Sequence, residues 1–298
     1  MPTVSPGSVI YGSDYNTIQS LVTQILGSGN PYGPGTGSPN YGYNQTLQSS
    51  LVNVGQVITG TQWQLLAADV STIYTHQIGS AWPSYAAQIS NQSSGKLITA
   101  ADYNSVFNAM TALVSTRLTV ASNQLATATV GSSTYSSTWG GGSSGIQNSG
   151  SITFASAAAL QYFFNQGGKL NFAGSGPTST STSQNLNWST ALTAFKPSID
   201  ATVFANLSGT AYNVYRAYNG SSPAGYTSSF IKLSATVSGA TISWLVTYED
   251  DHTNSFSDTV GAGVGYGVTI STATGAFTGT TNTSSSITNT WSTGTYTY

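Results

Sequence analysis

The sequence predicts an α+β protein, in which an N-terminal helical region is followed by an antiparallel β-sandwich-like domain with one or two short inserted helices. Three observations lead to this prediction. A helix-start pattern occurs three times before residue 115, apolar residues alternate along the chain after residue 150, and a stretch rich in Ser, Thr and Gly separates the two patterns. We therefore predict a helical docking region 1–127, a linker or edge segment 128–150 and a β-rich domain 151–298.

The three helix starts share a local pattern and comprise Ile10–Asn16, Ile58–Gln64 and Ile98–Asn104. In the second and third, a Thr stands at the predicted N-cap and Gln62 or Asp102 follows three residues later, which is the spacing of a capping box. An Ile before the cap and an aromatic residue after it have the spacing of a hydrophobic staple. In the first copy Tyr11 takes the cap position, so the staple and Asp14 alone remain.

Apolar residues at helical spacing follow each start, and they include Ile18, Val22 and Ile25, then Leu66, Val70 and Ile73, then Val106, Met110 and Leu113. Gly27 is the predicted C-cap of the first helix. We interpret Asp14 and Asp102 as first-turn acids that the helix dipole favours, rather than as a catalytic pair, and the same dipole explains His76 near a helix end. Because the stripes are short and strongly apolar, we expect the helices to complete their core with a neighbouring chain.

A Gly- and Pro-rich loop with interleaved tyrosines joins the first two helices. Its composition excludes regular structure, and aromatic rings offer a large contact area at a small entropic cost. Two interpretations stay open: a surface for another protein, or a loop folded onto its own domain. The interface candidates are Tyr32, Tyr41 and Tyr43 from this loop and Trp63 and Tyr103 from the helix starts.

Beyond residue 150 the pattern is typical of short strands. Ile242, Trp244, Val246 and Tyr248 alternate with polar or smaller residues, and further strands are predicted around Val203–Phe204, Tyr212–Tyr215, Phe230–Val237 and Val264–Ile270. Ala157 to Phe164 is compatible with a short helix between two strands. Asn187 is a candidate cap for a second short helix. Short strands at this spacing favour an antiparallel sandwich.

The composition is unusual because charged residues make up 5% of the chain, against about 25% in soluble proteins generally. Six Lys and Arg residues in total are too few for a phosphate-binding patch, so we expect no nucleic-acid partner. No apolar run is long enough to span a membrane, and the N-terminus lacks the features of a secretory signal. A surface of uncharged polar side chains suits fixed assembly with other proteins better than electrostatic solubility.

One dense group of ionisable residues is present, formed by Glu249, Asp250, Asp251 and His252, with Asp258 nearby. Clustered oxygen ligands favour Ca²⁺, so Glu249, Asp250, Asp251 and Asp258 are candidate ligands of a structural calcium ion. The alternative is a solvated acidic turn between two strands. No second carboxylate group faces this one as a glycosidase requires, and no nucleophile elbow, dinucleotide loop or zinc pattern is present. We therefore predict that the chain is not an enzyme and has no other cofactor.

Three stretches give the chain a resemblance to a family of virion structural proteins of tailed bacteriophages, especially T4-like phages of cyanobacteria. They are Ile98–Asn104 with its echo at Ile10–Asn16, the stretch Asn40–Leu66, and Tyr162–Phe172. The resemblance implies a place on the exterior of the virion and a fibre-like or structural role, and it implies no catalytic residues.

From these observations we expect a tail or neck fibre, whisker or adaptor protein that is a homo-oligomer and contacts other virion proteins. A capsid decoration protein is the first alternative. The second is a carbohydrate-binding module for a host surface glycan, in which Trp188, Trp244 or exposed tyrosines would stack on sugar rings.

Overall fold

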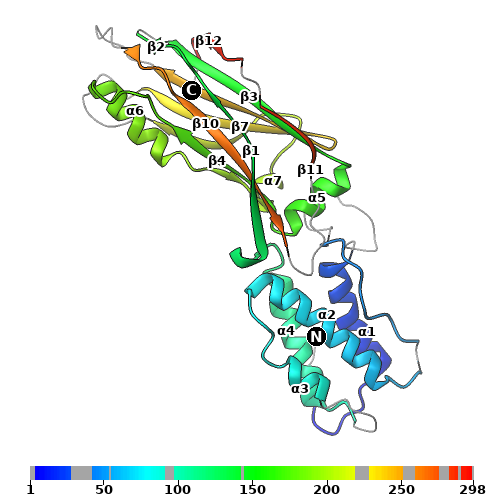
Figure 1. Cartoon of the computed structure of the whole chain (residues 1–298). Coiled ribbons are helices and arrows are strands. Elements are labelled where there is room, and N and C mark those ends of the chain that lie inside the picture. Colours follow the sequence, from blue (N-terminus) through cyan, green and yellow to red (C-terminus); the bar gives the residue numbers. More distant parts are fainter. Residues whose placement is uncertain are drawn as a thin grey trace. The chain divides into compact units, whose positions relative to one another are not determined.

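The computed structural model of the chain describes residues 4–27, 42–53, 55–90, 97–141, 144–218, 228–250, 259–274, 282–287 and 290–296. It confirms the α+β class, with helices concentrated in the N-terminal part and antiparallel sheets in the rest (Figure 1). The chain divides into two compact units. The helical unit holds the residues up to Ala126 together with Gln161–Gly167 and residues 272–274, and the sandwich unit holds the other described residues.

The helical unit contains α1 (Gly12–Leu26), α2 (Gly60–Ile78), α3 (Tyr85–Ser90) and α4 (Ala100–Ser115). The three long helices begin where the repeated pattern predicts. Gln62 N–H donates to Thr59 Oγ1 at 3.2 Å while Gln62 Oε1 accepts from Thr59 N–H at 2.9 Å, and Thr99 and Asp102 repeat this capping box at the start of α4. At α1 Asp14 accepts from the Tyr11 N–H at 2.8 Å. This is the capping-box bond that the side chain three residues after the cap makes.

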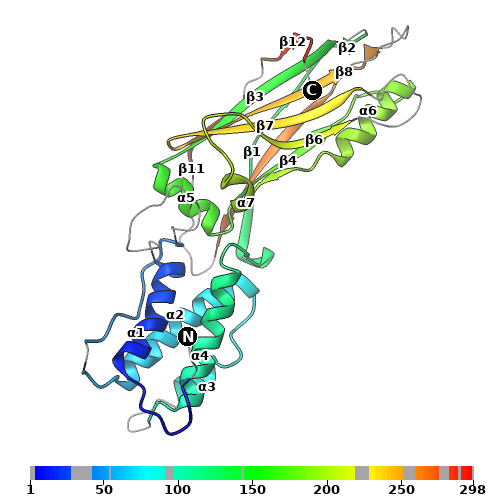
Figure 2. The same ribbon diagram turned by 180° about the vertical axis from the view of Figure 1, so that it is seen from behind.

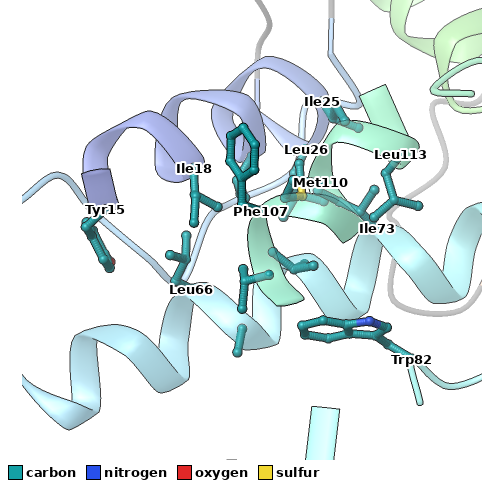
Figure 3. Close-up of a cluster of buried hydrophobic side chains, with 14 of the residues drawn as sticks. Tyr15, Ile18, Ile25, Leu26, Leu66, Ile73, Trp82, Phe107, Met110 and Leu113 are labelled. Atoms are coloured by element: carbon teal, nitrogen blue, oxygen red, sulfur yellow. The ribbon is translucent and has the colours of Figure 1, made fainter. Parts of the chain in front are cut away.

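The helices bury their apolar stripes against one another (Figure 3), and the stripe residues named above are at most 3% exposed. Each predicted stripe is therefore fully used within the chain. The expectation that the helices borrow a neighbour's core is corrected, because α1, α2 and α4 supply enough apolar surface to close a core of their own.

The sandwich unit is built from two larger antiparallel sheets and one small one. The first has the order β1-β10-β4-β5, with β1 Leu125–Thr134, β10 Gly265–Ala273, β4 Lys169–Ser175 and β5 Ser198–Ile199. The second has the order β11-β3-β8-β7-β6, with β11 Asn282–Ile287, β3 Ser144–Phe154, β8 Thr241–Asp250, β7 Phe230–Ser238 and β6 Tyr212–Tyr218, and β12 (Ser292–Gly294) also pairs with β3. A third pairs β2 (Trp139–Gly140) with β9 (Thr259–Val260).

The two larger sheets meet through the alternating residues of β8. Trp244 packs edge-on against Phe172 of β4, with ring centroids 5.5 Å apart, and its Nε1–H donates to the hydroxyl of Tyr266 on β10 at 3.1 Å. That hydroxyl donates to Asn148 Oδ1 on β3 at 2.7 Å, so the polar tips of buried rings find partners inside the core. The alternation read from the sequence thus identifies the inner face of β8 correctly.

Three local predictions need correction. The stretch 128–150 contains most of β1, all of β2 and much of β3; β1 is an edge strand, but β3 lies between β8 and β11 and is no linker. Val203 and Phe204 belong to a short helix, α7 (Ala201–Phe204), because the Asp200 carboxylate accepts from the Thr202 and Val203 N–H groups and caps it. The predicted helix in 157–164 is confirmed as α5 (Ala157–Asn165), whereas α6 (Ser183–Ala194) begins before Asn187 and is capped by Thr182.

Candidate contact surface

The acidic group predicted as a calcium site does not form an open ligand set among the described residues. Asp250 lies at the end of β8 and is 0% exposed. Its Oδ2 accepts from Gln184 Nε2 at 2.7 Å and from the Gly141 N–H at 3.3 Å, and its Oδ1 accepts from Ser229 Oγ at 3.1 Å. This carboxylate therefore ties α6, the turn after β2 and the start of β7 to β8.

Glu249 precedes Asp250 on the same strand, so its side chain leaves the opposite face of the sheet. Its Oε2 accepts from the Tyr296 N–H at 3.0 Å and lies above Gly145 of β3. Because the two carboxylates point away from each other, they cannot ligate one ion together. Asp251 and Asp258, the other two predicted ligands, and His252 lie outside the described residues. Within the described ranges, no three His, Asp or Glu side chains gather as a metal site would require.

The other described acids are also bound within the fold. Asp69 on α2 is buried and accepts from the N–H groups of Gln48 and Ser49 and from the Ser49 hydroxyl, the last at 2.6 Å. Asp14 and Asp102 serve the helix starts and Asp200 caps α7. Each described carboxylate therefore has a structural use that accounts for its place in the sequence.

The predicted interface aromatics that the structure describes are core residues. Tyr43, Trp63 and Tyr103 are 1%, 0% and 3% exposed. The Trp63 indole N–H donates to Gln88 Oε1 at 3.1 Å, and the Tyr43 hydroxyl donates to the Arg117 carbonyl, so their polar tips are also used inside the helical unit. The interface prediction is corrected for these three residues: Trp63 and Tyr103 are staple aromatics that fill the core, and the Tyr43 ring from the loop is buried there too. Tyr32 and Tyr41 lie outside the described residues.

Sugar stacking by the two named tryptophans is also ruled out by burial. Trp188 and Trp244 are 0% and 2% exposed. Trp188 packs edge-on against Trp139, with ring centroids 4.9 Å apart, and Trp244 packs on Phe172. Neither ring offers a free face, which a sugar-binding tryptophan needs.

A shallow cleft of about 260 Å³ lies on the helical unit and is lined by Gln48, Ala68, Ser71, Thr72, Thr75, His76, Tyr85 and Gln124. The lining is uncharged. His76 is fully buried, burial lowers its pKa to about 4, and its Nε2–H donates to the Gln166 carbonyl, which opposes that shift. The imidazole is therefore neutral at physiological pH, and the predicted attraction between a charged His76 and the helix dipole is corrected.

Five exposed apolar side chains stand in the segments that lead into α1, α2 and α4. Val57 and Leu97 are each 86% exposed, Val9 is 66%, Tyr11 is 64% and Leu51 is 62%. We call these five residues the apolar rim. In Figures 1 and 2 α1, α2 and α4 begin at the same end of the helical unit, and the Tyr15 hydroxyl in the first turn of α1 donates to the Gln62 carbonyl in the first turn of α2 at 3.2 Å.

The sequence itself indicates this rim through one further apolar residue in each helix start, which neither the capping box nor the staple requires. Val9, Val57 and Leu97 stand at the same position in the three copies, directly before the staple isoleucine. A staple needs one apolar residue before the cap, and Ile10, Ile58 and Ile98 pack partly against the core and fill that role. The second apolar residue in each copy has no use inside the unit, which points to a contact outside it.

No protein-family model matches the chain, and neither the curated proteins nor the solved structures contain a match. Among the described residues, no helix is both long and apolar enough to cross a membrane.

Proposed function

We propose that the chain is a structural protein of a tailed-phage particle, of the fibre, whisker or adaptor kind, which attaches through the apolar rim of its helical unit. The observation that carries this proposal is the exposed apolar residue at the same position of all three helix starts. An exposed apolar group of this kind marks a protein contact more often than a site of chemistry. The resemblance of the sequence to virion structural proteins is the reason for proposing a phage particle as its location.

Two further features support an assembly role over a catalytic one. The described carboxylates serve as helix caps or as buried acceptors that join segments, which leaves none of them arranged as a general acid and base. A chain with few charged residues can form few ion pairs, so its contacts depend mainly on apolar burial. Ionic screening does not weaken such contacts.

The test is quantitative mass spectrometry of gradient-purified particles before and after a wash at about 1 M NaCl, where the Debye length is about 3 Å. We expect the chain at a fixed ratio to the major virion proteins in both samples. A chain that is missing from purified particles contradicts the proposed function, and one that the salt wash removes contradicts attachment by apolar contact.

A further inference from the structure

The three helix starts are repeated in three dimensions as well as in sequence. When the starts are aligned, the staple aromatics Tyr15, Trp63 and Tyr103 coincide, and so do three layers of core residues: Ile18, Leu66 and Val106; Val22, Val70 and Met110; Ile25, Ile73 and Leu113. No residue in this set is more than 3% exposed. Figure 3 labels Ile18, Leu66 and Met110 among them. The same four positions on each helix therefore supply the core.

The residue after each staple aromatic binds the backbone of a segment that leads to another helix. Asn16 Nδ2 donates to the Val52 carbonyl and Asn16 Oδ1 accepts from the Val52 N–H, both at 2.9 Å. Asn104 makes the same two bonds with Val4, at 2.9 and 3.0 Å. Val52 is eight residues before Gly60 and Val4 is eight residues before Gly12, so the two clamps are equivalent in position as well as in chemistry.

The third helix completes the cycle. Gln64, at the same position on α2, donates through Nε2 to the Ile89 carbonyl at 3.3 Å, and Ile89 lies in α3, within the segment that leads to α4. Thus α1 holds the segment before α2, α2 holds the segment before α4, and α4 holds the segment before α1. Two of these contacts are equivalent, and the third is a single bond to a different position that joins the next pair of segments in the same order. The order of the three contacts is therefore that of an approximate threefold arrangement, here made within one chain.

The tips of the staple aromatics follow the same direction around the cycle. The Tyr15 hydroxyl donates to the Gln62 carbonyl of α2, and the Trp63 indole donates to Gln88 of α3. Tyr103 of α4 is close enough to Asp14 of α1 for that carboxylate to contribute, after burial, to the raised pKa of its hydroxyl. Tyr15 and Trp63 therefore bond to the same neighbouring parts of the chain, in the same order, as Asn16 and Gln64 do: α2 with the segment before it, and then α3.

We propose that the apolar rim docks into an apolar, concave surface on a threefold axis of another protein of the particle, with one copy of this chain on each axis. This inference rests on the proposed function and adds the symmetry and chemistry of the partner. Val9, Val57 and Leu97 are the three equivalent contacts, because they occupy one position of the repeat and are the most exposed apolar residues there.

The size of the rim argues against a second copy of this chain as its partner. Each large side chain presents roughly 60–120 Å² of apolar surface when it is fully exposed, so five that are 62–86% exposed offer roughly 200–450 Å². A stable pair of proteins buries about 800 Å² on each side. Two rims that meet end to end fall short of this area, whereas a cup that surrounds all three helix starts adds the polar surface between them.

The chemistry of the rim decides which surface fits it. None of the five rim residues is charged, and the nearby Asp14 and Asp102 are bound to the helix starts as caps. Lys96, which precedes Leu97 in the sequence, lies outside the described residues. Against these five side chains a charged partner surface would lose water without gaining an ion pair. The partner is therefore apolar where it meets Val9, Val57 and Leu97.

The experiment measures binding of the full chain to purified particles that lack it. The variants are Val9→Ser, Val57→Ser and Leu97→Ser, and the matched control is Leu186→Ser, which changes a 55% exposed leucine of the sandwich unit. Because these side chains are exposed, we expect each variant to keep the wild-type melting temperature. We expect each rim variant to raise Kd by a similar factor, roughly tenfold, and the control to leave Kd unchanged.

The same binding curves give the number of sites. We expect one bound chain for every three copies of the partner protein. Rim variants with strongly unequal effects, or one bound chain for each partner copy, overturn the threefold inference while leaving the proposed function in place. A rim-dependent dimer of the free chain overturns the choice of partner. Particles that bind no chain at all contradict the proposed function itself.

Discussion

Asn104 holds both backbone groups of Val4, a residue one hundred positions earlier in the chain, by donating to its carbonyl and accepting from its N–H. This pair of bonds fixes the segment that leads into α1 against the N-terminal part of α4. Asn16 does the same to Val52. Asparagine suits the task because its amide offers one donor and one acceptor side by side, which matches a single backbone residue.

We expect Asn104→Ala to destabilise the protein by about 1–3 kcal/mol, because it leaves the N–H and carbonyl of Val4 without these partners in a half-buried place. Urea unfolding followed by far-UV circular dichroism measures the change. Asn108→Ala is the matched control, since Asn108 is exposed on the same helix. Equal stability of the two variants would show that the clamp contributes nothing.

Gly145 of β3 is predicted to tolerate no side chain. A Cβ at this position would lie 2.1 Å from Glu249 Oε2 and 2.6 Å from the Tyr248 carbonyl, both on the paired strand β8. We expect Gly145→Ala to lower the free energy of unfolding by about 1–3 kcal/mol or more. Gly209→Ala is the control, because nothing lies within 4 Å of its added Cβ. Thermal melts of the two variants that coincide would refute the close approach.

In acid, the free energy of unfolding of the chain is expected to fall through protonation of His76. Its pKa is about 4 in the folded chain and near 6.5 when unfolded, so between these values the unfolded chain binds the extra proton. Its contribution is fully present above pH 6.5 and is lost as the pH falls toward 4, by roughly 3 kcal/mol in all. We expect His76→Gln to flatten the stability curve in this window. A parallel curve for the variant would mean that other groups cause the acid sensitivity.

Calcium is expected to leave the stability unchanged. Both Asp250 oxygens accept hydrogen bonds from protein groups, and Glu249 points to the other face of the sheet. Melting temperatures in EDTA and in added Ca²⁺ should therefore agree. An increase with Ca²⁺ that Asp250→Asn abolishes would restore the calcium interpretation.

The helix starts could be predicted from sequence because capping boxes and staples are local rules, and in two of the three copies both rules select one register. The inner face of β8 could be predicted for a similar reason, since Ile242, Trp244, Val246 and Tyr248 alternate without interruption. The central strand β3 could not. Its sequence, rich in Ser and Gly, has weak strand propensity, and close approaches such as that of the Trp244 ring to Gly150 give those glycines their purpose.

The proposed contact surface is harder to predict, because aromatic residues suggest an interface and a core equally well. Trp63 and Tyr103 lie in the core, where large rings bury the most apolar area. The exposed position is the smaller residue before each staple isoleucine. The exposed residues of the three copies can form one surface because the three helices begin at one end of the unit. This arrangement belongs to the tertiary structure and cannot be predicted from the local sequence pattern.

The proposed attachment requires the apolar rim to lie against another virion protein. A photoreactive benzophenone residue at Val57 tests it most directly in intact particles, with one at Leu186 as the control. We predict an ultraviolet-induced cross-link from position 57 to a single different virion protein and a much weaker one, or none, from position 186. Equal cross-linking from both positions, or none from position 57, would contradict the account.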